Sequence, residues 1–151
     1  VVIYFEAEDL PDLYDFFSSI KTDVVVDHMG RPDVTKDPDG PEFGLFLKFM
    51  RENPNVWTKV SCPERLSVTG PRALDGEQNA YADVVPFARR VVEEFPDRVL
   101  WGTDWPHPNL KDHMPDDGLL VDYIPHIAPT ADLQQKLLVD NPRRLYWPEG
   151  V

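Results

Sequence analysis

Apolar and polar residues alternate with two different patterns along this chain. Short runs of β-branched and aromatic residues, such as residues 24–26, are typical of strands that are covered on both faces. Between these runs, apolar residues recur at three- and four-residue spacing, which is typical of amphipathic helices. The expected strands are residues 1–5, 23–28, 56–60 and 98–102, and the expected helices are residues 10–20, 43–50, 84–95, 119–127 and 130–139.

Turn-forming residues mark the breaks between these elements. Residues 29–39 and 61–78 are expected to be loops, and Asn141-Pro142 is expected to end the last helix. No linker, repeat or low-complexity stretch interrupts the pattern. Residues 1–151 are therefore expected to form a single domain.

The regular alternation of strand and helix predicts an α/β fold with a parallel sheet. A doubly wound sheet and a (β/α)8 TIM barrel both fit this alternation, and both place their chemistry at the carboxyl ends of the strands. A full barrel needs ~250 residues, so four βα units in 151 residues would supply about half of one. Because the chain opens on Val1, inside an expected strand, we expect a fragment or a truncated reading frame.

Charge and composition argue against several classes of partner. The formal net charge is −12 at pH 7, which disfavours nucleic acid or an anionic membrane as the main partner. Neither of the glycine-rich phosphate-binding motifs is present, so nucleotide binding has no support. The single cysteine, Cys62, allows no internal disulfide, and no apolar run approaches the length of a membrane span. These features predict a cytoplasmic location.

The strongest candidate for chemistry is the segment GTDWPHPN, which follows the last expected strand. Its aspartate, Asp104, lies between two tryptophans, where a carboxylate can serve as a general base for water or as a metal ligand. The alternative is a helix N-cap, a common role for an aspartate after a strand. The grouping of Asp104 with His107 and Asn109 favours a site.

Two other expected strands also end in polar residues. His28 follows the second strand, where a histidine can ligate a metal or polarise a carbonyl, or be purely structural. Arg31 and Arg65 lie in the loops after the second and third strands. Two arginines on one rim would suit a small dicarboxylate, because the guanidinium binds carboxylates through paired hydrogen bonds. The alternative is a pair of ordinary surface arginines.

Other candidates have simpler explanations. Cys62 fits a small buried residue better than a nucleophile. Tyr4 could face a ligand from the first strand, although a core aromatic is the favoured interpretation. His113 and His126 are expected to be structural or surface residues. No G-x-S-x-G motif is present, so a serine nucleophile on an elbow turn is not indicated.

Four segments together, VVVDHMGRPD, KVSCPERL, RVLWGTDWPHPN and LLVDNPRRLYWPE, resemble the amidohydrolase superfamily and, within it, the pyrone dicarboxylate lactonases. The resemblance implies a (β/α)8 barrel of which this chain supplies roughly the second half. The superfamily pattern has a His-x-His pair after the first strand, a histidine near the middle strands and an aspartate after the last. His28 matches the middle histidine and Asp104 the last aspartate, whereas the His-x-His pair is absent from this chain.

The resemblance also implies a reaction and a set of roles. The reaction is hydrolysis of 2-pyrone-4,6-dicarboxylate to 4-oxalomesaconate, without a cofactor, in the breakdown of lignin-derived aromatics. Asp104 would take a proton from water, and His28 would polarise the ring carbonyl. Arg31 and Arg65 would hold the two substrate carboxylates. Tyr4 and His107 would make further substrate contacts.

Two alternatives remain open at this point. The first is a metal-dependent relative on the same barrel, such as a sugar lactonase or a decarboxylase, with a divalent metal such as zinc. The second is an inactive fragment, because the His-x-His pair lies outside the chain.

Overall fold

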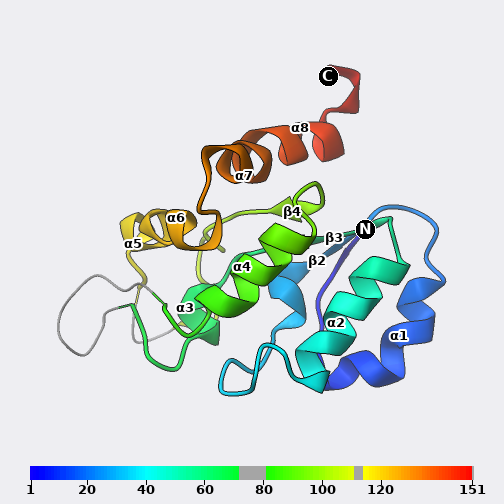
Figure 1. Ribbon diagram of the computed structural model, residues 1–151, viewed down its shortest axis with the longest axis horizontal. Coiled ribbons are helices and arrows are strands. Elements are labelled where there is room, and N and C mark those ends of the chain that lie inside the picture. Colours follow the sequence, from blue (N-terminus) through cyan, green and yellow to red (C-terminus); the bar gives the residue numbers. More distant parts are fainter. Residues whose placement is uncertain (72–80, 111–113, 151) are drawn as a thin grey trace.

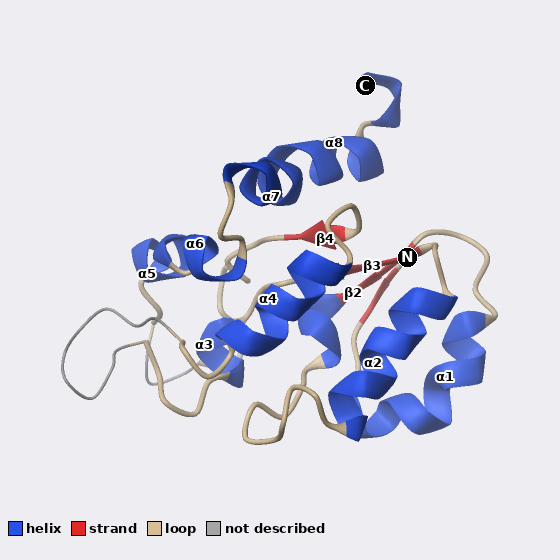
Figure 2. Cartoon of the chain, in the orientation of Figure 1, coloured by secondary structure: helices blue, strands red, loops and turns tan. Residues whose placement is uncertain are grey.

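The computed structural model describes residues 1–71, 81–110 and 114–150. Its centre is a four-stranded parallel sheet in the order β1-β2-β3-β4, which is also the order of the strands in the sequence. The strands are β1 (Val2–Ile3), β2 (Val24–Val26), β3 (Val56–Lys59) and β4 (Val99–Leu100). The four strands are short segments among helices and loops (Figure 2). The expected α/β class and parallel sheet are confirmed.

Helices connect the strands and continue the chain after β4 (Figure 1). They are α1 (Leu10–Ser18), α2 (Pro41–Glu52), α3 (Pro63–Leu66), α4 (Val85–Glu94), α5 (Asp117–Asp122), α6 (Ile124–Ile127), α7 (Ala131–Gln135) and α8 (Asn141–Tyr146). Short 3-10 turns span Ala7–Asp9, Asp27–Gly30 and Pro148–Gly150, and a π turn spans Lys136–Asp140. Within the described part of the chain, no helix is long and apolar enough to cross a bilayer.

The main core lies between one face of the sheet and the helices α1, α2 and α4 (Figure 1). Val26 and Val56 of the sheet are fully buried there, together with Phe49 of α2 and Val91 of α4. Burying each side chain of this kind contributes about 1.5–3 kcal/mol. The core therefore fixes the sheet and leaves the carboxyl ends of its strands free to carry polar groups.

The opposite face of the sheet has a smaller apolar cluster. Val25, Trp57 and Leu100 pack there against Leu145 of α8, and the guanidinium of Arg144 lies 5.1 Å from the centre of the Trp57 ring. These positions alternate with those of the main core, as the two-residue period of a strand requires.

The last helical region does not end at Asn141-Pro142, so the expectation of a helix end there was wrong. A π turn precedes α8, and Pro142 lies in the first turn of α8, where its missing N–H costs little. The Asn141 side chain is fully buried and donates to the carbonyls of Pro96 and Val99. These two bonds tie α8 to β4.

Three other boundaries differ from the sequence prediction. The first strand pairs only through Val2–Ile3, because the chain turns toward α1 directly after Phe5. The expected helix 119–127 is divided into α5 and α6, with Pro125 in the first turn of the second helix. The expected loop 61–78 contains the one-turn helix α3, and its residues 72–78 lie outside the described ranges.

Candidate active site

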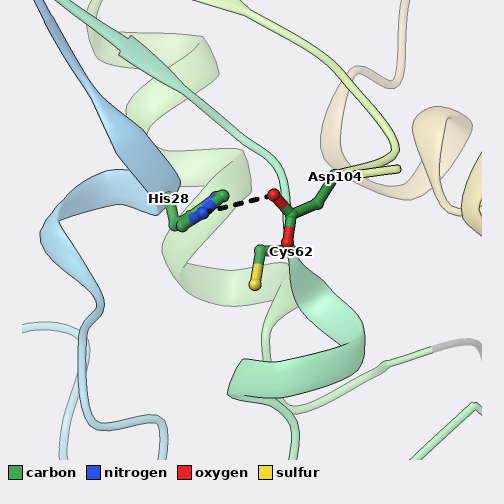
Figure 3. A group of neighbouring side chains, drawn as sticks. All are labelled: His28, Cys62 and Asp104. Carbon is green, nitrogen blue, oxygen red and sulfur yellow. Dashed lines mark ion pairs between the residues drawn. The ribbon is translucent and has the colours of Figure 1, made fainter. Parts of the chain in front are cut away.

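Three polar side chains meet beyond the carboxyl ends of the strands. His28 follows β2, Cys62 follows β3 and precedes α3, and Asp104 follows β4. Figure 3 shows the His28 ring and the Asp104 carboxylate directed toward each other, with Cys62 beside the carboxylate. The sheet is parallel, so its strands deliver their following residues to the same edge. The predicted convergence of His28 and Asp104 is observed in the structure.

The backbone at these three residues is unusual. His28, Cys62 and Asp104 have φ values of 54°, 66° and 65°, in the left-handed region that side-chain-bearing residues rarely adopt. Strain of this kind persists only where the surroundings enforce it, and it clusters at functional sites. The turn after β2 is left-handed from His28 through Arg31, and Gly30 is required in it, because a Cβ there would lie 2.8 Å from the Phe5 ring.

Arg65 joins the three residues into one network. Its Nη2 lies 2.6 Å from Asp104 Oδ2 and 3.2 Å from His28 Nε2, and its Nε lies 2.9 Å from Cys62 Sγ. A guanidinium can only donate, so His28 Nε2 accepts and the imidazole proton lies on Nδ1. Nδ1 then donates to Ser61 Oγ at 2.9 Å. Arg65 is thus placed between the candidate base and the candidate imidazole.

Burial lowers the pKa of His28, because the cationic imidazole is poorly solvated at this position. The carboxylate of Asp104, whose Oδ1 lies 3.5 Å from His28 Nε2, acts in the opposite direction and does not reverse the shift. His28 is therefore neutral at pH 7. This state agrees with the hydrogen bond that its Nε2 accepts from Arg65.

Cys62 is a buried thiol rather than a reactive one. Burial raises its pKa to about 12, and neighbouring Glu64 acts in the same direction. The thiolate is the reactive form of cysteine, so Cys62 stays protonated and unreactive near neutral pH. The expectation of a small buried residue is confirmed.

His28, Cys62 and Asp104 are also the described residues whose donor atoms come close enough to share a metal ion, all within 4.8 Å of one another. The donor chemistry does not favour an ion in this arrangement. The Cys62 thiol would have to lose its proton, and burial raises the pKa of that thiol. In addition, the Arg65 guanidinium already contacts both His28 and Asp104, and a metal would have to displace it.

Arg31 and Tyr4 lie beside this network and form a group with Glu6. Arg31 Nε donates to the Glu6 carboxylate at 2.8 Å, and the Tyr4 hydroxyl donates to the same carboxylate at 2.7 Å. The Tyr4 ring is 52% exposed and meets the His28 ring edge to face at 6.2 Å. The core interpretation of Tyr4 was therefore wrong, because this end of β1 is not covered in the described chain.

The predicted residues line two different hollows. One has a volume of about 330 Å³ and is lined by Asp27, His28, Lys59, Ser61, Trp101, Gly102, Thr103, Asp104 and Trp105. The other has a volume of about 260 Å³ and contains Arg31 and Arg65. Arg31 and Arg65 therefore line the same hollow, and Arg65 reaches the residues of the first hollow through its contacts with His28 and Asp104. Lys59, which the sequence analysis missed, adds an ammonium to the first hollow, 2.7 Å from Asp27.

His107 lies behind the network. Its side chain is 1% exposed, with Nδ1 3.2 Å from Glu64 and Nε2 3.1 Å from Asp117. The described contacts of the His107 side chain are with protein carboxylates. The predicted contact between His107 and a substrate therefore stays a prediction. Of the other histidines, His126 is exposed, as expected, and His113 lies outside the described residues.

Asp104 does not cap a described helix. The next helix along the chain, α5, is capped by Asp116, whose side chain accepts from the Gly118 N–H. The N-cap interpretation of Asp104 was therefore wrong. What remains is a carboxylate held by Arg65 next to a neutral imidazole, an arrangement that can take a proton from water.

The parallel α/β sheet and the histidine and aspartate at its strand ends are features of a barrel hydrolase, and comparison with known proteins identifies the class. Residues 1–147 match the amidohydrolase family, and the chain belongs to that family. Over 151 residues it is 85% identical to a 2-pyrone-4,6-dicarboxylate hydrolase of Comamonas testosteroni, covering 100% of this chain and 50% of the relative. It is 37% identical to a 4-sulfomuconolactone hydrolase of Hydrogenophaga intermedia, covering 97% of this chain and 46% of the relative.

Solved structures agree on the fold. A crystal structure from Agrobacterium tumefaciens superposes with a TM-score of 0.79 at 29% identity, covering 97% of this chain and 49% of that chain. A Pseudomonas putida protein described as a 2-pyrone-4,6-dicarboxylic acid hydrolase gives a TM-score of 0.73 at 29% identity, covering 96% and 50%. The chain spans about half the length of the curated relatives it matches. The expected family and the expected half of a barrel are both confirmed.

Proposed function

We propose that this chain forms the water-activating half of a barrel that hydrolyses 2-pyrone-4,6-dicarboxylate. The observation that carries the proposal is the position of Arg65, whose Nη2 contacts both Asp104 and the neutral His28. A cation at this point can receive a substrate carboxylate and bring the lactone ring to the base. The 85% identity to a hydrolase of this lactone supports the substrate assignment.

The proposed reaction begins when a substrate carboxylate binds Arg65. Asp104 then removes a proton from water, and the water oxygen bonds to the carbonyl carbon of the ring ester. When the resulting tetrahedral intermediate collapses, the bond from that carbon to the ring oxygen breaks. The ring oxygen leaves as an enolate and takes up the proton that Asp104 removed from water, which gives 4-oxalomesaconate and restores the Asp104 carboxylate.

His28 has a defined part in this proposal. Once Arg65 turns toward the substrate, His28 Nε2 no longer accepts its hydrogen bond. In the proposal the neutral imidazole then adopts its other tautomer, in which the Ser61 hydroxyl donates to Nδ1 and the N–H at Nε2 donates to the ring carbonyl. Ser61 contacts Nδ1 and holds the ring in orientation. Donors that meet the developing oxyanion are among the largest contributions to this kind of catalysis.

Arg31 and Tyr4 keep substrate roles in the proposal. Arg31 lies at the second hollow, and Tyr4 contacts Glu6 beside it; both would meet the other substrate carboxylate after Arg31 leaves Glu6. We place the reaction in the degradation of aromatic compounds in the cytoplasm, and we propose that it needs no cofactor. The Arg65 guanidinium supports a metal-free site, because it supplies positive charge where a metal would otherwise do so.

A metal-dependent lactonase is the second candidate function. The observation that favours it is the grouping of His28, Cys62 and Asp104 within 4.8 Å. In such an enzyme Arg65 would move aside, and His28 and Asp104 would be the ligands. Dependence on a divalent metal separates this candidate from the first.

The test uses a joined barrel, in which this chain follows the N-terminal half of the Comamonas testosteroni relative. We expect the joined barrel to open 2-pyrone-4,6-dicarboxylate, as followed by loss of the pyrone absorbance, and the 151-residue chain alone to be inactive. Activity should persist after dialysis against EDTA, because the positive charge of the proposed site comes from Arg65.

Three lactones form the substrate panel: 2-pyrone-4,6-dicarboxylate, 4-sulfomuconolactone and D-galactarolactone. Preference for the first supports the proposal. A joined barrel that prefers another lactone contradicts the substrate assignment. Activity lost with EDTA and restored by zinc supports the metal-dependent candidate.

A further inference from the structure

A buried trio of side chains lies directly behind the proposed site. His107 is held between Glu64 Oε1 and Asp117 Oδ1, at 3.2 and 3.1 Å, and we call these three residues the clasp. The side chains of His107 and Glu64 are 1% and 2% exposed, whereas that of Asp117 is 53% exposed. A contact between two fully buried polar groups is costly to break, because each group loses its partner without gaining water.

The clasp joins the two segments that carry the proposed reacting groups. Glu64 directly precedes Arg65 on α3. His107 follows Asp104, and its backbone N–H donates to the Asp104 carbonyl at 2.8 Å. Two bridges therefore run side by side between α3 and the loop after β4. Glu64–His107 forms the buried bridge, and Arg65–Asp104 forms the bridge at the site.

Neither segment is held in place by regular secondary structure. The helix α3 has only four residues, and a helix of that length is not stable by itself. The loop after β4 has left-handed residues at Asp104, His107 and Asn109. Side-chain contacts must therefore fix where the two segments meet. The second contact of His107, to Asp117, ties the same loop to the first residue of α5.

We infer that His107 is a positioning residue, and that its bond to Glu64 sets the meeting point of Arg65 and Asp104. This role deepens the proposed function and rests on it for the reaction. It differs from a direct substrate contact, because a side chain that is 1% exposed presents almost no surface to a ligand. Misplacing reacting groups by about 1 Å can cost up to 10²-fold in rate, so the clasp should act mainly on kcat.

Two substitutions separate the two contacts of His107 in the joined barrel. The amide nitrogen of asparagine can occupy the place of Nδ1, so His107→Asn keeps the Glu64 bond. The amide nitrogen of glutamine lies near the place of Nε2, so His107→Gln keeps only the Asp117 bond. We expect kcat to fall about tenfold or more in His107→Gln and to remain within about threefold of the parent in His107→Asn. The matched control is His126→Gln, at an exposed histidine of α6.

Hydrogen exchange gives a second readout that needs no turnover. The backbone amides within residues 62–66 and 103–107, apart from the prolines, should exchange faster in His107→Gln than in His107→Asn, whose rates should match the parent. His107→Ala, which leaves room for water between the two carboxylates, replaces His107→Gln if that variant does not fold. If the parent opens no lactone, the proposed function fails, and the exchange rates alone decide the role of His107.

The inference is overturned by any of three results. The two variants could lose kcat equally, which would make the Glu64 bond irrelevant. KM alone could rise, which would indicate a substrate contact. The exchange rates of the two segments could stay unchanged in His107→Gln, which would show that the clasp does not hold them.

Discussion

Replacing Asp104 with asparagine in the joined barrel is expected to lower kcat by about 10²–10⁴, which is the range of general-base catalysis. The amide keeps the size of the side chain but cannot accept a proton from water. The steady-state rate of pyrone ring opening checks this result. KM should change much less, because the substrate carboxylates are assigned to arginines rather than to Asp104.

The control is Asp15→Asn, which removes the same charge from an exposed position on α1. This variant should match the parent. An Asp104→Asn enzyme that keeps more than a tenth of the parent kcat would show that another group activates the water.

Replacing Arg65 with methionine is expected to cost about 2–5 kcal/mol in kcat/KM for the dicarboxylate, the range found when one partner of a buried charge pair is truncated. Two effects combine in this change. The substrate loses its cation, and Asp104 loses the donor that lies 2.6 Å from its Oδ2. Arg65→Lys should recover little, since one ammonium cannot reproduce a guanidinium that contacts His28 and Asp104 through Nη2 and Cys62 through Nε.

The comparison that isolates the anion-binding role of Arg65 uses unsubstituted 2-pyrone, which has no carboxylates. Arg65→Met should lose much more of its kcat/KM with the dicarboxylate than with 2-pyrone. Arg89→Met, at an exposed position of α4, is the matched control. Equal losses on the two lactones would contradict the assignment of Arg65 to a substrate carboxylate.

The sequence predicted the parallel sheet and the convergence of His28 and Asp104 because both follow from local patterns. A run such as Val24-Val25-Val26 identifies a covered strand by itself. Residues that follow parallel strands must reach one edge of the sheet. The positions of these two side chains therefore needed no knowledge of contacts distant in the sequence.

The ion-pair partners of the two arginines could not be predicted from the sequence in the same way. Arg31 and Arg65 occupy similar places after their strands, yet Arg31 pairs with Glu6 while Arg65 reaches Asp104. The choice depends on side-chain directions in a left-handed turn and in a one-turn helix, and neither element has a distinctive hydrophobic period. For Lys59 and Ser61, the only sequence feature that indicated a place in the site was their position at the end of β3.

The sequence also did not predict which side chains near the site are buried and which are exposed. His107 belongs to the segment GTDWPHPN, which made a substrate contact a natural prediction. Its burial depends on Glu64 and Asp117, which come from different helices and are 43 and 10 residues away. Tyr4 is the opposite case, since an aromatic in a strand suggests a core position, whereas its ring is half exposed beside His28.

A crystal structure of the joined barrel with pyridine-2,4-dicarboxylate, a stable aromatic ring that carries two carboxylates, tests the central claim most directly. We expect one carboxylate to accept hydrogen bonds from the Arg65 guanidinium, and the ring to face His28 Nε2 and Asp104 Oδ1. A ligand bound away from Arg65, or an ion held between His28 and Asp104 in its place, would contradict the account.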